Sequence, residues 1–338
     1  MYRRVVLAAS LAGVLALSAC SGGDPLDAGA SGSASPAGDL QQLTVGIPAG
    51  YAATAPIRLG VEKGCFADEG LELTFESAPT PSALATLISQ GEWAIGAPDI
   101  GTVVQATSQG VPLKIIHPGW IAGDDPDASD GIGGIVVKAD SPIQTIADLA
   151  GTTIAASGVN DITAATIKEA LRKAGADPDS VTLVSVPTPN VIGTVISGDA
   201  AAGAASEPGI TQGVADGTLR FLFNQRVAGG APGFPNGPLV SSEKWIEENP
   251  EAAAGFVRGV QCSVDYAREH PEELRDFILT FTEIDPALVQ EMPLANWGDA
   301  VTDDSFVDGV DRVIELMAGL GLISGEMPAE DIMWAPGD

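Results

Sequence analysis

Polar and aromatic side chains stand directly after several predicted β-strands and in the segments that connect the two halves of the chain. The carboxylates of Asp99, Asp161 and Glu207 accept hydrogen bonds from amines or hydroxyls, and Tyr51 and Trp120 offer rings for stacking. In open parallel sheets, ligands bind beyond the carboxyl ends of strands, where the next helix presents free N–H groups. The candidate ligand-binding residues are therefore Gly50, Tyr51, Asp99, Trp120, Ser157, Asn160, Asp161, Thr163, Glu207, Phe234 and Asn236.

Each candidate also has a structural interpretation. Gly50 lets a ligand approach the backbone, and Tyr51 is either a contact or a packed loop aromatic. Asp99 opens a helix, so it can serve as the N-cap, accept from a ligand amine, or do both. Trp120 is expected to be exposed in a Gly-flanked crossover, where it either stacks on a planar ligand or packs at a hinge.

The segment 157–163 leads from a strand into a long helix. Ser157, Asn160 and Thr163 are uncharged hydrogen-bonding residues beside the free N–H groups of that helix, and we expect one of them to be its cap. Glu207 follows another strand. Its carboxylate either binds an amine or hydroxyl across a cleft or forms a salt bridge at a hinge.

The motifs typical of catalysis are absent from the sequence. His117 and His270 lack metal-ligand spacing, and no phosphate-binding loop, GxGxxG or GxSxG motif stands at a strand-to-helix junction. We therefore expect no enzyme, and hence no catalytic residue, no cofactor and no metal.

The N-terminus is typical of an exported lipoprotein. Arg3 and Arg4 precede an apolar run over residues 5–17, and the run ends in Leu-Ser-Ala-Cys at 17–20. This ending resembles the lipobox of bacterial lipoproteins, which predicts a signal peptide at 1–19 and lipidation of Cys20; the alternative is a plain secretory signal. Residues 20–42, rich in Ser, Gly, Ala and Pro, predict a flexible tether. The expected location is the outer face of the cytoplasmic membrane.

Composition excludes one class of partner. The chain of 338 residues has 45 acidic and 16 basic residues, a formal charge of −29. Nucleic-acid binding depends on Lys and Arg that neutralise phosphates, so no nucleic-acid partner is expected. The length allows two medium domains with ordinary cores.

Strands and helices alternate from residue 43 onward, which predicts parallel βαβ units in a doubly wound α/β arrangement. The predicted strands are 43–48, 71–76, 93–97, 112–117, 134–138, 152–156, 181–186, 200–205 and 219–223. The predicted helices are 55–63, 82–90, 99–109, 145–149, 162–174, 191–196, 209–215, 242–248, 250–268, 271–280 and 304–319.

Two blocks of this pattern predict two lobes. Lobe I comprises 43–122 plus 236–338, and lobe II comprises 123–235 with the crossovers. The first crossover, 123–130, is acidic and polar. The second, 224–237, is rich in Gly and Pro and contains Phe234 and Asn236. Apart from Cys20, the cysteines are Cys65 and Cys262, for which a disulfide and two buried free thiols are both open interpretations.

Four stretches in order resemble a known family: APIRLGVEKGCFADEGLEL (55–73), SALATLISQGEWAIGAPDIGTVVQATSQGVPLKII (82–116), IVVKADSPIQTIADLAGTTIAASG (135–158) and EALRKAGADPDSVTLVSVP (169–187). Glu207-Pro208 follows an Ala-rich strand, as in the same family. The chain thus resembles the solute-binding proteins of ABC importers, in the nitrate/sulfonate/taurine and thiamine-precursor (SsuA/THI5-like) branch.

The resemblance implies a two-lobed periplasmic-binding-protein fold of type II, with a mostly parallel sheet in each lobe and a double crossover as hinge. It further implies a monomer that closes on one small molecule and delivers it to a membrane permease. The alternatives are an enzyme like the thiamine-pyrimidine synthase, which shares the fold but carries a cluster of cysteines, and a sensor or adhesin without a transporter.

The residues near the cleft favour one class of ligand. Asp99, Asp161 and Glu207 make the predicted cleft acidic, and Arg226 is the one arginine near a crossover. We therefore expect a neutral or cationic, donor-rich compound, planar ones included, such as a nitrogenous pyrimidine. A sulfonate, taurine or nitrate-type anion is the alternative ligand in the same transport role.

Overall fold

The computed structural model describes residues 40–324 and 327–337. The predicted signal peptide, the lipidation site Cys20 and most of the tether lie outside these residues. The last predicted tether residues, Gln41 and Gln42, instead begin the first strand. No helix within the described ranges is long and apolar enough to span a bilayer.

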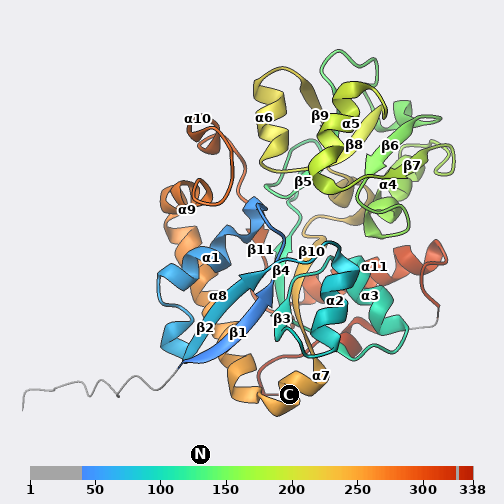
Figure 1. Cartoon of the computed structure of the whole chain (residues 1–338). Helices are drawn as coiled ribbons and strands as arrows, with labels where there is room; N and C mark the ends of the chain where they lie inside the picture. The colour runs from blue at the N-terminus through green and yellow to red at the C-terminus, as the bar shows by residue number, and fades with distance from the viewer. Residues whose placement is uncertain (1–39, 325–326, 338) are drawn as a thin grey trace, which may run out of the picture. The chain divides into compact units, whose positions relative to one another are not determined.

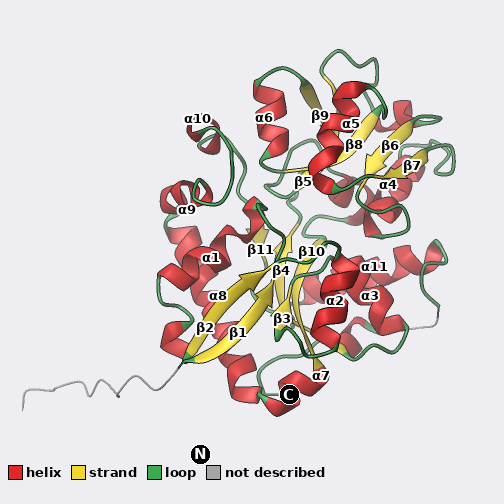
Figure 2. Ribbon diagram, viewed as in Figure 1, coloured by secondary structure: helices red, strands yellow, loops and turns green. Residues whose placement is uncertain are grey.

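The described strands form two mixed sheets (Figures 1 and 2). The strands of the first sheet are β1 (Gln41–Gly46), β2 (Leu71–Glu76), β3 (Ile95–Gly96), β4 (Leu113–Ile121), β10 (Pro235–Ser242) and β11 (Asn296–Trp297). Their order is β11-β4-β10-β3-β1-β2. β1 pairs in parallel with β2 and β3, whereas β10 is antiparallel to β3 and β4.

The second sheet has the order β7-β6-β8-β5-β9. Its strands are β5 (Gly133–Lys138), β6 (Thr153–Ala156), β7 (Thr182–Ser185), β8 (Ala202–Ser206) and β9 (Leu219–Phe223). β6 is parallel to β7 and β8, and β5 is antiparallel to β8 and β9. Each sheet is therefore mixed rather than mostly parallel, because a strand next to a crossover runs against the βα units.

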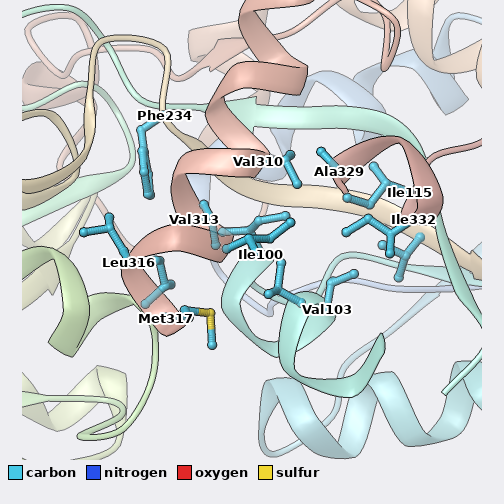
Figure 3. Close-up of a cluster of buried hydrophobic side chains, with 14 of the residues drawn as sticks. Ile100, Val103, Ile115, Phe234, Val310, Val313, Leu316, Met317, Ala329 and Ile332 are labelled. Carbon is cyan, nitrogen blue, oxygen red and sulfur yellow. The ribbon is translucent and has the colours of Figure 1, made fainter. Parts of the chain in front are cut away.

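Helices cover both faces of the first sheet. The helices that follow or flank its strands are α1 (Ala55–Glu62), α2 (Pro81–Ser89), α3 (Ile100–Ser108), α7 (Glu243–Glu248), α8 (Pro250–Glu269), α9 (Pro271–Ile278), α10 (Pro286–Val289) and α11 (Asp304–Gly319). Alternating strand residues face opposite sides: Val240 packs with α2, α3 and α11, and Leu239 packs with α1 and α8. Figure 3 shows the first of these clusters around α11.

The second sheet is covered in the same way. Its helices are α4 (Ile162–Lys173), α5 (Val191–Ser197) and α6 (Gly209–Ala215). Ile135 and Val137 of β5 pack against the α4 side, and Val136 between them packs against α5 and α6. The period of two along β5 therefore builds two separate clusters, one on each face.

Hydrogen bonds join the two crossovers between the sheets, residues 122–132 and 224–234. Buried Asp130 accepts from the backbone N–H of Gly123 (3.1 Å) and Ile132 (3.1 Å) and from the amide of Asn224 (2.7 Å). The N–H of Ala122 also donates to the carbonyl of Phe234 at 2.9 Å. One carboxylate thus ties both crossovers together.

Cys65 and Cys262 form a disulfide with Cα atoms 5.7 Å apart. Cys65 lies just after α1 and Cys262 lies in α8, so the bond joins segments 197 residues apart in sequence. Cys65 packs among the buried residues that separate these helices from the first sheet.

The sequence did not predict β10. Its first residues, Pro-Asn-Gly-Pro, are typical of a loop, and we expected the chain to become helical from about residue 241. The structure instead places β10 between β4 and β3, with shifted register at Pro235, Gly237 and Leu239. These irregularities accommodate the two prolines, which donate no ladder hydrogen bond.

Candidate ligand-binding site

A cavity of about 630 Å³ is lined by turns from both sheets. Eight of the predicted candidates line it: Tyr51, Asp99, Trp120, Ser157, Asn160, Asp161, Thr163 and Asn236. Its other polar lining residues include Thr80, Ser82, Thr102, Gln105, Ser185, Thr188 and Arg226. The carboxyl ends of β2, β3, β6 and β7 thus lead toward one space.

The turn between β3 and α3 places Asp99 at the helix start. Oδ1 of Asp99 accepts the backbone N–H of Thr102 at 3.0 Å, and Oδ2 accepts the Thr102 hydroxyl at 2.5 Å. Both carboxylate oxygens are therefore used within the turn. Burial raises the pKa of Asp99, and these hydrogen bonds oppose the rise because they favour the ionised form.

The turn between β6 and α4 places Asp161 in the equivalent position. Its Oδ1 accepts the backbone N–H groups of Thr163 (3.0 Å) and Ala164 (3.1 Å), so Asp161 caps the helix. The expectation that Ser157, Asn160 or Thr163 would be the cap is wrong. Asp161 stands directly before the first helical residue, and one oxygen of its carboxylate reaches both N–H groups.

These two turns approach each other across the cavity. A Cβ on Gly101 would lie 2.8 Å from Cβ of Ile162, so only glycine fits where the start of α3 meets the start of α4. Burial and the nearby charge of Asp99 raise the pKa of Asp161 to about 6, while its backbone hydrogen bonds and Arg226 act in the opposite direction.

Aromatic rings form another part of the lining. Trp120 lies within β4 and only 2% of it is exposed, so the expectation of an exposed crossover tryptophan is wrong. Its ring packs edge-to-face on Tyr51 and on Trp297, with centroid distances of 5.7 Å in both cases. The Tyr51 hydroxyl donates to the carbonyl of Ile132 at 3.3 Å, and burial raises its pKa.

Arg226 brings a positive charge to the cavity. It begins the π-helical turn Arg226–Gly230 after β9, and its Nε donates to Oδ1 of Asn236 at 2.6 Å. Among the described residues, Nη1 has no hydrogen-bond partner, and Arg226 forms no salt bridge. The predicted cleft was acidic, whereas the observed cavity contains charges of both signs.

Three candidates lie elsewhere. Gly50 is exposed in a turn with φ of +62°. Phe234 is 1% exposed in the cluster around α11 that Figure 3 shows. Glu207 is 2% exposed, and its carboxylate accepts from the hydroxyl of Ser129 (2.6 Å) and the N–H of Thr211 (3.0 Å). It lines a separate cavity of about 340 Å³.

Several lining residues were not predicted, because we looked for ligand contacts beyond the carboxyl ends of only some of the predicted strands. Thr80 caps α2 after β2, and Thr188 follows β7, so both stand beyond strand ends like Asp99 and Asp161. Extending the strand-end rule to every parallel strand would have found them. For Arg226, the only feature of the sequence that pointed to the cavity was its position in the second crossover.

Comparison with known proteins gives the family. Residues 52–274, more than half of the chain, match the family model described as NMT1/THI5 like. The chain belongs to this family. As an NMT1/THI5-like protein it is also 24% identical over 237 residues to the formylaminopyrimidine-binding protein of Halalkalibacterium halodurans, with 69% of this chain and 68% of that protein covered.

Solved structures share the fold of this NMT1/THI5-like chain. The alkanesulfonate-binding protein SsuA from Xanthomonas axonopodis pv. citri, bound to MOPS, has a TM-score of 0.72 at 17% identity, covering 88% of this chain and 99% of that one. The periplasmic nitrate-binding protein NrtA from Synechocystis PCC 6803 has a TM-score of 0.60 at 14% identity, covering 88% and 92%. The expected α/β periplasmic-binding-protein fold is thereby confirmed, with two mixed sheets flanked by helices.

Proposed function

We propose that this protein is the solute-binding component of an ABC importer and that the 630 Å³ cavity holds a small polar, nitrogen-containing solute. The observation that carries the proposal is the meeting of two aspartate-capped helix starts, one from each sheet, at one cavity. The carboxylate of Asp161, which caps its helix through Oδ1, has its second oxygen to accept an N–H group from a solute. The formylaminopyrimidine-binding relative supports a nitrogenous solute, and the sulfonate- and nitrate-binding proteins of the same fold support a transport role.

The proposed capture step is hinge closure. Residues 43–122 with 236–338 act as one lobe and 123–235 as the other, connected by the two crossovers. The Asp130–Asn224 hydrogen bond holds the crossovers side by side, so that both bend together. A solute that contacts both helix starts stabilises the closed arrangement over the open one.

The proposed partners are a membrane permease, which receives the solute, and a lipid anchor at Cys20, with the protein on the outer face of the cytoplasmic membrane. Several acyl chains on one residue give stable anchoring where a single chain is marginal. Metabolic labelling with a palmitate analogue tests the anchor, since Cys20→Ser removes the acceptor thiol.

We propose binding without catalysis. The enzyme alternative requires a cluster of cysteines, and Cys65 and Cys262 are joined to each other away from the cavity. Among the described residues, no group of three or more His, Cys, Asp and Glu side chains is placed to hold a metal ion. The relatives reported above are named as binding proteins.

A second candidate ligand is an anion of the sulfonate, taurine or nitrate type. Arg226 favours this candidate because its guanidinium lines the cavity with Nη1 unpaired among the described side chains.

Thermal unfolding with a compound panel tests the proposal. Nitrogen heterocycles should raise the Tm of the purified protein more than nitrate or ethanesulfonate does, and small-angle scattering should show a smaller radius of gyration with a stabilising compound. Stabilisation by the anions alone would favour the second candidate. A lack of compaction on binding would contradict hinge closure.

A further inference from the structure

Two hydrogen-bond donors of the cavity lining lack a partner in the part of the chain that the structure describes. They are Nη1 of Arg226 and Nε1 of Trp120, and both atoms are buried. Buried donors are almost always paired, because an N–H without an acceptor destabilises the folded protein. A bound molecule with an acceptor group would satisfy both.

The indole of Trp120 is fixed in direction. Tyr51 and Trp297 hold its ring edge-to-face, and the ring edge that carries Nε1 faces Gly237, another residue of the lining. A Cβ at Gly237 would lie 2.0 Å from Cε2 and 2.5 Å from Nε1 of Trp120, so the indole edge fits in its place only because residue 237 has no side chain. The donor is therefore preorganised rather than free to seek another partner.

The guanidinium of Arg226 is also held in place. Its Nε is bound to Asn236, which leaves Nη1 directed away from that bond. The positive charge of Arg226 opposes the rise that burial causes in the pKa of Tyr51 and of Asp161. No salt bridge joins Arg226 to Asp99 or Asp161, although all three residues line the same cavity and belong to the described chain.

Asp161 provides the opposite chemistry. Its Oδ1 receives both backbone N–H groups of the helix start, and within the described ranges no hydrogen bond reaches Oδ2. Gly158 leaves room for this oxygen, since a Cβ there would lie 1.8 Å from it. The cavity thus has an unused acceptor on Asp161 and unused donors on Arg226 and Trp120.

We infer that the solute has two ends: an acceptor group, a carbonyl or an oxyanion, lies against Arg226 and Trp120, and an N–H group lies against Asp161. The inference rests on the proposed function, because it assigns the ligand chemistry of the same cavity. It narrows both candidates above, since a compound with donors alone or an anion without an N–H group leaves one side of the site unpaired. Such one-ended compounds bind weakly.

Two matched trios of compounds test the inference by isothermal titration calorimetry with the wild-type protein. The first is 1-methylcytosine, with an amino group and a carbonyl, against the acceptor-only analogue 1-methyl-2-pyrimidinone, which has no N–H group, and the donor-only analogue 4-aminopyrimidine, which has no carbonyl or oxyanion. The second is taurine against ethanesulfonate and ethylamine. In at least one trio the two-ended compound should bind at least tenfold more tightly than both of its one-ended analogues.

Two variants test which residue binds each end of the solute. Asp161→Asn keeps a helix-capping residue but loses the charge, and it should reduce the advantage of the two-ended compound over its acceptor-only analogue at least tenfold. Arg226→Gln should do the same relative to the donor-only analogue. Asp177→Asn removes an exposed carboxylate that also accepts a backbone N–H, away from the cavity, and should leave every affinity within twofold. Melting curves without ligand confirm that each variant is folded.

The outcomes separate the inference from the proposed function. A one-ended compound that binds as tightly as its two-ended analogue would overturn the inference and leave solute binding intact. Unchanged selectivity in both Asp161→Asn and Arg226→Gln would also overturn it. Absence of binding by all six compounds would contradict the proposed function together with the inference.

Discussion

The turn before α3 and the turn before α4 belong to different sheets, yet each puts an aspartate at a helix start and faces the same cavity. Asp99 uses both carboxylate oxygens on Thr102, whereas Asp161 satisfies two N–H groups with Oδ1 and leaves Oδ2 without a hydrogen bond in the described chain. The same residue at the same helix position is thus a fully occupied cap in one turn and a cap with a spare acceptor in the other. Position after a strand finds both residues, and only the hydrogen bonds separate their roles.

Gly158→Ala should have the largest effect, because it removes the space for the spare oxygen of Asp161. The new Cβ would lie 1.8 Å from Oδ2, so the carboxylate must move. We expect a loss of up to about 3 kcal/mol in the free energy of unfolding, measured with urea, because overpacking forces side chains from their preferred positions. Affinity for a cavity ligand should fall more than tenfold.

Gly193→Ala is the matched control for this change. A Cβ at Gly193 in α5 meets no heavy atom within 4 Å, so this variant should be as stable as the wild type or more stable. Equal stability and affinity for Gly158→Ala and Gly193→Ala would show that the position of the Asp161 carboxylate does not depend on this space.

The next largest effect is expected in the pH dependence of stability, through the carboxylate of Asp161. The pKa of Asp161 is raised to about 6 in the folded protein, so the folded state binds a proton there between about pH 4 and 6 that the unfolded chain does not. Asp161 therefore contributes stability below pH 4 that is lost as the pH rises through 6. The free energy of unfolding of Asp161→Asn, relative to that of the wild type, should therefore increase by on the order of 2 kcal/mol from pH 4 to pH 7.

The comparison must be a difference between variant and wild type, because buried His117 acts in the opposite direction. Burial lowers the pKa of His117 to about 3, so stability falls as the pH drops from 6.5 toward 3. This contribution is common to both proteins and cancels in the difference. A difference between wild type and Asp161→Asn that stays constant from pH 4 to 7 would contradict the raised pKa.

Alanine at each cap gives a smaller effect, measured at pH 7. Asp99→Ala should cost about 1–2 kcal/mol, since it removes a cap whose two oxygens are both bonded. Asp161→Ala should cost less than about 1 kcal/mol, because the lost cap is partly offset by removal of a buried charge. A larger loss in Asp161→Ala than in Asp99→Ala would reverse the assigned roles.

Thr102→Val tests the difference between the Asp99 and Asp161 caps through a single hydrogen bond. It removes the hydroxyl that donates to Oδ2 of Asp99, which should cost about 0.5–1.5 kcal/mol and leave Asp99 with a free oxygen like that of Asp161. Thr163→Val is the control, since Thr163 donates to its aspartate only through the backbone N–H. Equal losses in the two variants would mean that the Thr102 hydroxyl adds nothing to its cap.

Much of the fold could be predicted from local patterns. The strand β9 and the helix α11 were predicted with their observed bounds, because their apolar residues follow the period of the element and their ends carry clear turn or cap residues. β10 could not be predicted, since two prolines and a glycine favour a loop locally. Its strand geometry depends on irregular pairing with β4, which only the tertiary structure provides.

The site was predictable to a similar extent. Asp99 and Asp161 follow strands that end at the cavity, so topology alone identifies them. Trp120 was placed in an exposed crossover because the fourth predicted strand ended at residue 117, but β4 continues to Ile121 and buries the ring. Arg226 reaches the cavity from a π-helical turn, a geometry with no simple sequence pattern.

The most direct test of the account is calorimetric titration of 1-methylcytosine and 1-methyl-2-pyrimidinone into the wild type, Asp99→Asn and Asp161→Asn. The two compounds differ by the amino group, so the change in their affinity ratio on mutation measures contact between that group and each aspartate. We predict that the preference for 1-methylcytosine falls at least tenfold in Asp161→Asn and stays within threefold in Asp99→Asn. An unchanged preference in Asp161→Asn, or an equal loss in both variants, would contradict the assignment of Asp161 as the residue that binds the solute.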